Sequence, residues 1–152
     1  MLPRPPMDVI CEELKAERLN DSRQMQNLVD EVVVGAMGVH NAMNYFKRGV
    51  LVITPGDRED IVLAAATTLF GPAEDGLAGI VLTGNLQPSP SVIKVIRQMP
   101  FPVLLAKEDS YFVASAVHDL IVKTRPHDTE KISIIRDLIA EHVDVNKILK
   151  AL

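Results

Sequence analysis

The sequence predicts an α/β fold built on a mostly parallel sheet. Short runs rich in β-branched residues end in glycine or proline, and each is followed by an amphipathic stretch of about ten residues. Two of these runs, Val50 to Thr54 and Gly79 to Leu82, are apolar at odd and even positions alike, which is typical of strands covered by helices on both faces. The length of 152 residues is enough for one core of ordinary size.

The chain begins with a proline-rich stretch. Residues 1–6, "MLPRPP", suit neither a helix nor a sheet and are predicted to be a linker-like tail. Residues 7–152 are then predicted to form a single domain. Its first element is a helix in "MDVICEELKAERL", where Val9, Ile10 and Leu14 have helical spacing. Cys11 is the only cysteine, so it excludes an internal disulfide and is expected to be a small apolar residue of this helix.

The alternation then places strands and helices along the rest of the chain. Strands are predicted at Glu31 to Gly35, Val50 to Thr54, Gly79 to Leu82 and Val103 to Ala106, with a weaker one near Ile121 to Lys123. Helices are predicted to start near Val39, Arg58, Ser89 and Asp109, and two more are expected at Thr129 to His142 and Val145 to Leu152.

Polar turns follow the predicted strands. They read "TPGDRED" after Thr54, "LTGN" at 82–85, "AKEDS" at 106–110 and "GAMG" at 35–38. Right-handed crossovers bring the carboxyl ends of parallel strands to one edge of the sheet, so these turns are expected to meet there. Ligands of open α/β sheets usually bind at this edge.

The turn "TPGDRED" concentrates charge at the start of a helix. Pro55 and Gly56 favour a turn, and Asp57 is predicted to cap the helix that follows. Arg58 then lies in the first helical turn, where the positive end of the helix dipole disfavours a cation. It therefore requires a partner, and the candidates are nearby acids such as Asp57, Asp60 and Asp109, the carbonyls of "LTGN", or an anionic ligand.

Two interpretations of this edge remain open. In one, the charged and polar residues form a hydrogen-bonded brace between turns, with Thr83 supplying a hydroxyl and Gly84 its backbone freedom. In the other, they contact a ligand. The predicted ligand-binding set is Gly56, Asp57, Arg58, Asp60, Thr83, Gly84 and Asn85.

Composition and spacing exclude several functional classes. A net charge of −4 and a pI near 5.5 disfavour a nucleic-acid surface, which requires clustered Lys and Arg. The apolar runs are too short to cross a bilayer and no secretory signal is visible, so a cytoplasmic protein is expected. The glycines match neither a dinucleotide fingerprint nor a P-loop, and no cofactor is predicted.

No catalytic or metal-binding set is recognisable either. The four histidines show no ligand spacing, and the lone cysteine has no partner thiol. Ser110 and Ser115 lack a nucleophile elbow, and no pair of carboxylates is spaced for acid–base chemistry. The chain is therefore not expected to be an enzyme by itself.

The segments "GVLVITPGDREDIVLAAA" and "AGIVLTGN" resemble the DRTGG domain. The resemblance rests on Asp57-Arg58 and Thr83-Gly84, and similar flanking segments extend it from about Pro6 to Ile148. One position departs from the family pattern, because Asn85 stands where the last glycine is expected. Asn accepts a left-handed backbone more readily than most residues, so the turn can be kept while the space above it shrinks.

The resemblance implies a fold and a role. Domains of this family are similar to the N-terminal domain of HPr kinase/phosphorylase, with three α/β/α layers and a mostly parallel central sheet. They occur beside a dethiobiotin-synthetase-like P-loop domain and a catalytic domain in some phosphate acetyltransferases, and beside CBS domains in some pyrophosphatases. There they are regarded as regulatory or assembly elements, with no established catalytic residue.

Three hypotheses follow. The first is a non-catalytic interaction module that forms a homo-oligomer, most simply a dimer, and regulates a P-loop or acetyltransferase partner domain. A positive mean hydropathy of +0.15 and six methionines favour it, because they leave apolar surface for assembly. The second is a sensor of a nucleotide or other small anion. The third is an enzyme in its own right, such as an acetyl or phosphoryl transferase, for which no nucleophile–base pair or metal site is recognisable. A further alternative is a stand-alone or fragmentary part of a phosphate acetyltransferase-type enzyme, with catalysis in other domains.

Overall fold

A computed structural model of the chain describes residues 4–71, 76–122 and 133–138. Residues 4–121 form one compact unit, and residues 122–152 belong to a second unit together with 1–3. The elements are α1 (Met7–Leu14), β1 (Glu17–Arg18), β2 (Glu31–Val34), α2 (Val39–Ala42), η1 (Met43–Tyr45), β3 (Val50–Pro55), α3 (Glu59–Ala66), η2 (Thr67–Phe70), β4 (Gly79–Thr83), α4 (Pro90–Ile96), β5 (Val103–Leu105) and α5 (Ser110–Val122).

The central sheet has five strands in the order β1-β5-β4-β3-β2. Strands β2 to β5 pair in parallel, which confirms the four principal strands predicted. The two-residue β1 pairs antiparallel to β5 at one edge. It was not predicted, because Glu17 and Arg18 are both exposed and carry no apolar alternation.

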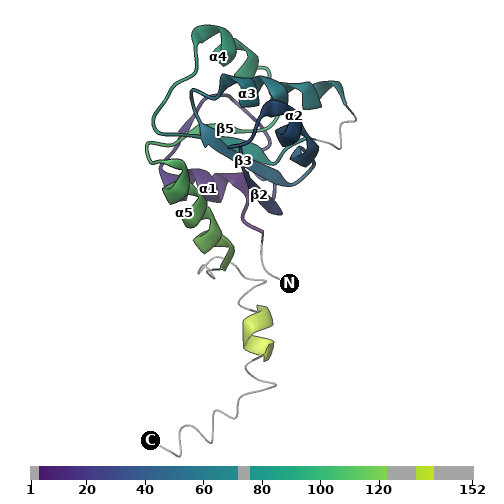
Figure 1. The fold of residues 1–152 in the computed structure, drawn as a ribbon. Coiled ribbons are helices and arrows are strands. Elements are labelled where there is room, and N and C mark those ends of the chain that lie inside the picture. The colour runs from purple at the N-terminus through teal and green to yellow at the C-terminus, as the bar shows by residue number, and fades with distance from the viewer. Residues whose placement is uncertain (1–3, 72–75, 123–132, 139–152) are drawn as a thin grey trace, which may run out of the picture. The chain divides into compact units, whose positions relative to one another are not determined.

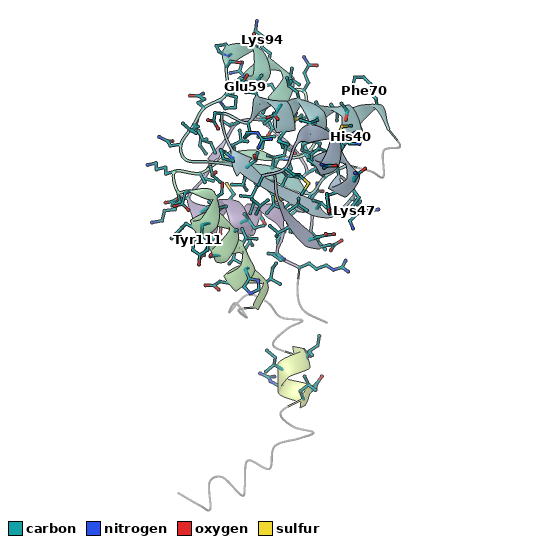
Figure 2. The ribbon with its side chains drawn as sticks, in the orientation of Figure 1. His40, Lys47, Glu59, Phe70, Lys94 and Tyr111 are labelled. Atoms are coloured by element: carbon teal, nitrogen blue, oxygen red, sulfur yellow. The ribbon has the colours of Figure 1, made fainter. Side chains whose placement is uncertain are left out.

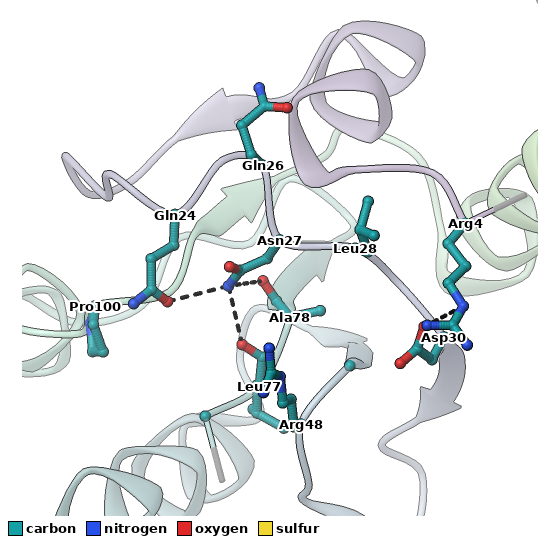
Figure 3. Close-up of a pocket in the computed structure, with 12 residues that line it drawn as sticks. Arg4, Gln24, Gln26, Asn27, Leu28, Asp30, Arg48, Leu77, Ala78 and Pro100 are labelled. Carbon is teal, nitrogen blue, oxygen red and sulfur yellow. Dashed lines mark hydrogen bonds and ion pairs between the residues drawn. The ribbon is translucent and has the colours of Figure 1, made fainter. Parts of the chain in front are cut away.

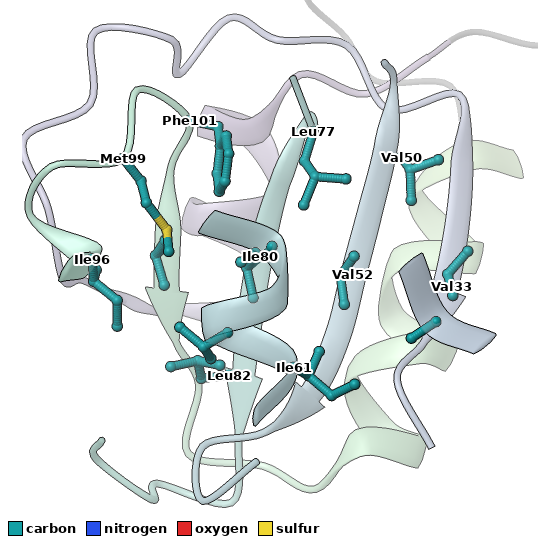
Figure 4. Close-up of a cluster of buried hydrophobic side chains, with 14 of the residues drawn as sticks. Val33, Val50, Val52, Ile61, Leu77, Ile80, Leu82, Ile96, Met99 and Phe101 are labelled. Carbon is teal, nitrogen blue, oxygen red and sulfur yellow. The ribbon is translucent and has the colours of Figure 1, made fainter. Parts of the chain in front are cut away.

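Helices cover both faces of the sheet, as the α/β/α prediction requires (Figure 1). On one face, α2, α3 and α4 contribute Ala42, Ile61 and Ile96 to a core with the inward side chains of β3, β4 and β5 (Figure 4). On the other face, α1 and α5 contribute Ile10 and Val117 to a second core. β4 is buried at all five positions, because both of its side-chain parities face helices.

The weaker strand predicted near Ile121 to Lys123 is wrong for the residues described there. Helix α5 continues to Val122, since Val113, Val117 and Leu120 repeat at helical spacing and are all buried. Of the helix predicted at Thr129 to His142, residues 133–138 are described and are helical. The helix predicted at Val145 to Leu152 lies outside the described residues.

The predicted linker overlaps the folded unit. Pro6 forms a bridge with Leu28, and the Val29 amide donates to the Pro5 carbonyl. Met7 is fully buried, and its side chain fills the space that a Cβ on Gly79 would occupy. Cys11 is half-buried against the second core, as expected for a small apolar residue. None of the helices in the described part of the chain combines the length and apolar character that crossing a bilayer requires.

Asn20 is a buried polar residue that ties the edge of the sheet together. Its Nδ2 lies 3.2 Å from the carbonyl oxygens of Ile96 and Met99 and 2.9 Å from that of Phe101. Its Oδ1 accepts from the Val103 amide at 3.0 Å. One side chain thus satisfies backbone groups along the whole α4–β5 connection, which no sequence pattern indicates.

Replacing Asn20 by Ala is expected to lower the free energy of unfolding by about 3 kcal/mol, because buried carbonyls and one amide lose their partner. Urea denaturation of the purified chain measures this. Asn44→Ala is the matched control, since Asn44 is exposed, and its effect should stay within about 0.5 kcal/mol. Equal effects of the two substitutions would contradict the role assigned to Asn20.

Candidate functional site

The two halves of the motif adjoin where β3 and β4 end. Pro55 pairs with Thr83 in the register of these strands, and the Gly56 amide continues the pairing by donating to the Thr83 carbonyl at 3.2 Å. A Cβ on Gly56 would lie 1.6 Å from the carbonyl oxygen of Leu86. The backbone of the β3–α3 turn therefore packs directly on the loop after β4, and only glycine fits at this position.

Arg58 is committed to neighbouring groups. Its Nε and Nη2 bind the two carboxylate oxygens of Asp60 at 2.9 and 3.0 Å. Its Nη1 and Nη2 also donate to the carbonyls of Gly35 and Met37, at 3.3 and 3.1 Å. Asp60 was a predicted partner and is confirmed, whereas the β2–α2 loop was not among the predicted partners. The guanidinium bonds are directed at that loop and not at Thr83 and Gly84.

The Arg58–Asp60 pair changes the acidity of both groups. The hydrogen bond from Arg58 lowers the pKa of the Asp60 carboxyl, and the same bond raises the pKa of the guanidinium. The Arg58 side chain is 29% exposed and that of Asp60 is 48% exposed. Water therefore screens the attraction between the two charges, and the pair contributes little to stability through that attraction. Its main effect is to fix the orientation of the Arg58 side chain.

Asp57 does not cap helix α3 as predicted. The cap position is occupied by Arg58, and no side chain bonds to the first amides from there. The Arg58 amide closes a turn by donating to the Pro55 carbonyl, which leaves Asp57 inside the turn and one residue too early. The backbone amides of Asp60 and Ile61 help to lower the pKa of the Asp60 carboxyl, after the larger effect of Arg58.

The second half of the motif joins the loop after β5. The Thr83 and Ser110 hydroxyl oxygens are 2.7 Å apart, although 27 residues separate them in the chain. The Gly84 amide donates to the Glu108 carbonyl at 2.7 Å, and the Asn85 amide donates to the Ala106 carbonyl at 3.0 Å. These contacts depend on two successive left-handed residues.

Gly84 has a φ of 76° and Asn85 a φ of 54°. Both values lie in the left-handed region, where glycine is favoured and asparagine is tolerated better than most residues. The prediction that Asn85 keeps the shape of the turn is confirmed. The amides of both residues consequently face the β5–α5 loop.

Three further residues belong to this network: Glu59 and Glu108, which were not singled out from the sequence, and Asp109, which was named as a candidate partner of Arg58. The Glu59 carboxylate accepts from the Ser89 amide and so links the starts of α3 and α4. The Asp109 carboxylate caps α5 by accepting from the Phe112 amide at 2.8 Å. Oε2 of Glu108 is buried with no hydrogen-bond partner among the described residues. The cap by Asp109 follows a local pattern, an Asp just before a helix, whereas the Glu59–Ser89 contact spans 30 residues and requires the fold.

The chain matches the profile of the DRTGG domain over residues 9–120. It is 31% identical to the phosphate acetyltransferase of Nitratidesulfovibrio vulgaris over 150 residues, which cover 97% of this chain and 21% of that protein. It is 32% identical to the phosphate acetyltransferase of Pseudomonas aeruginosa over 138 residues, which cover 89% of this chain and 19% of that protein. The chain therefore spans about a fifth of the length of these relatives.

A solved structure supports the fold. It contains the CBS and DRTGG domains of the regulatory region of Clostridium perfringens pyrophosphatase, complexed with the activator diadenosine tetraphosphate. The similarity covers 90% of this chain and 60% of that chain, with a TM-score of 0.61 and 20% sequence identity. The family profile covers most of the folded unit, including both halves of the motif at Gly56 and Thr83, and the chain belongs to the DRTGG domain family.

Proposed function

We propose that this chain is a regulatory module without catalytic activity of its own, which senses a nucleotide or another small anion and passes the response to a catalytic domain. The observation that carries the proposal is the hydrogen-bond network of the motif. Arg58 binds the β2–α2 loop, Gly56 packs on the β4–α4 loop, and Gly84 binds the β5–α5 loop. A displacement of any one of these loops would therefore change the hydrogen bonds and packing of the other two.

The ligand would bind at the carboxyl edge, among Gly56, Asp57, Arg58, Asp60, Thr83, Gly84 and Asn85. The neighbouring pyrophosphatase region, which is complexed with diadenosine tetraphosphate, supports a nucleotide as the ligand class. A phosphate that attracted the Arg58 guanidinium would release the carbonyls of Gly35 and Met37.

The catalytic partner would be a domain of the phosphate acetyltransferase type, because the chain aligns with about a fifth of such enzymes. The alternative, that the chain is a part of such an enzyme with catalysis in other domains, has the same support. The dimer and the cytoplasmic location stay proposals, and each of two separate exposed aromatic side chains could take part in self-association. Phe70 is 92% exposed and Tyr111 84%, and the two lie on opposite sides of the unit (Figure 2).

The sensor proposal predicts that diadenosine tetraphosphate raises the melting temperature of the chain in a saturable manner. Arg58→Ala should reduce this shift by more than half, relative to the variant's own baseline. Arg97→Ala is the control, because Arg97 is exposed at the opposite end of α4 and should leave the shift unchanged. An unmoved melting temperature in the parent contradicts the sensor.

Two further measurements test the rest of the proposal. Turnover of acetyl phosphate by the purified chain would contradict the non-catalytic assignment. A monomer at about 50 μM by light scattering would contradict the dimer.

Gly56→Ala should disconnect the two halves of the motif. The new Cβ would overlap the Leu86 carbonyl, so the expected loss is about 2–3 kcal/mol of unfolding free energy, measured by urea denaturation. Gly38→Ala is the control for steric overlap, because a Cβ there meets no atom within 4 Å; Gly38 is the N-cap of α2, so a loss of about 0.5–1 kcal/mol is expected. A stable Gly56→Ala protein with unchanged loops would refute the close approach.

The Arg58–Asp60 pair predicts a pH dependence. The pKa of Asp60 is lowered in the folded state, so its contribution to stability is complete above the ordinary carboxyl pKa and is lost as the pH falls through the lowered value. The parent should therefore exceed Asp60→Asn in unfolding free energy at about pH 6, and the difference should shrink below about pH 4. Paired urea titrations measure this, and a difference that is constant between these pH values would exclude the ion pair as its source.

A further inference from the structure

Figure 3 shows a pocket of the structure, which has a volume of about 520 Å³. It lies at the amino ends of the strands, whereas the motif follows the carboxyl ends of β3 and β4. Gly49 and Ala78 line it just before β3 and β4 begin, and Pro100 lines it ahead of β5. The remaining lining residues are Arg4, Gln24, Gln26, Asn27, Leu28, Asp30, Arg48, Gly76 and Leu77. Its volume is within the range of small-molecule sites.

One wall of the pocket is held in place by Asn27. Its Nδ2 lies 3.1 Å from Oε1 of Gln24, 3.4 Å from the Leu77 carbonyl and 3.3 Å from the Ala78 carbonyl. These bonds fix the amide to the strand that starts behind it. The Oδ1 of Asn27 and the Nε2 of Gln24 have no partner among the described residues, so one acceptor and one donor are left for a ligand.

The charged groups of the pocket do not balance. Arg4 pairs with Asp30 through Nε and Oδ1 at 2.9 Å. The Asp30 carboxylate is also seated against Gly49, whose absent Cβ would lie 2.3 Å from Oδ2. Arg48 is the second cation, and it has no ion pair or hydrogen bond with any residue of the described part of the chain. Figure 3 shows the Arg4–Asp30 bond and no bond from Arg48 to the residues drawn.

We infer that this pocket binds a small organic oxyanion, a phosphate monoester or a polycarboxylate of up to mononucleotide size, with Arg48 as the principal ligand-binding residue. A guanidinium matches two oxygens of a phosphate or carboxylate with parallel hydrogen bonds. The pocket carries a surplus positive charge although the net charge of the chain is −4. This local charge attracts anions to the pocket. Gln24 and Asn27 supply polar contacts for the rest of the molecule.

The inference is tested by titrating the chain with AMP, citrate and inorganic phosphate in a calorimeter, with adenosine as the uncharged comparison. AMP or citrate should bind with a Kd below about 1 mM, and adenosine should bind at least about tenfold more weakly than AMP. Arg48→Ala should weaken binding about tenfold or more, and Arg48→Lys should be intermediate because it keeps the charge without the fork. Amide side-chain NMR signals of Gln24 and Asn27 should shift on binding.

Lys47→Ala is the matched control. Lys47 is adjacent and exposed, but it pairs with Glu31 at 2.8 Å and is outside the pocket lining, so its removal should change affinity less than about twofold. The inference is overturned if none of the three anions binds saturably, if Arg48→Ala binds like the parent, or if adenosine binds as well as AMP. Binding that is lost in Arg58→Ala and kept in Arg48→Ala would place the ligand at the motif edge and would also overturn it.

Discussion

The contact between the β3–α3 turn and the loop after β4 is the constraint on which the rest of the edge depends. The parallel register that opposes Pro55 and Thr83 leaves Gly56 facing Leu86 with no room for a side chain. This contact places Arg58 next to the loop after β2, where it binds the Gly35 carbonyl. It also places the left-handed residues 84 and 85 next to the loop after β5. A residue with a Cβ at position 56 would push the β3–α3 turn away from the loop after β4.

The brace interpretation of the motif agrees with the bonds observed, and it also gives a physical basis for the regulation proposed above. The Arg58 guanidinium holds two carbonyls of a loop that a competing anion could take from it. Because the pair with Asp60 is partly exposed, exchanging one partner for another involves little desolvation. Order–disorder of a loop whose contacts are individually modest is one of the known ways in which binding at one site changes the state of another.

The sequence was informative where the physics is local. Alternation of apolar runs and amphipathic stretches predicted β2 to β5 and the helices between them, because both patterns record burial directly. It could not reveal β1, whose Glu17 and Arg18 pair with β5 without any apolar signal, or Asn20, whose four bonds join residues about eighty positions away. For the site, Asp60 was found as a partner of Arg58 because it is two residues distant, while Ser110 required the fold.

The left-handed conformation of Asn85 has a consequence for how kinship is recognised in this family. The backbone at position 85 has a positive φ, which glycine adopts most readily but asparagine also adopts here. A search for the five literal residues of the signature would pass over this chain, although its turn is intact. In this chain asparagine meets the need for a positive φ at position 85, whereas a β-branched residue there would be strained.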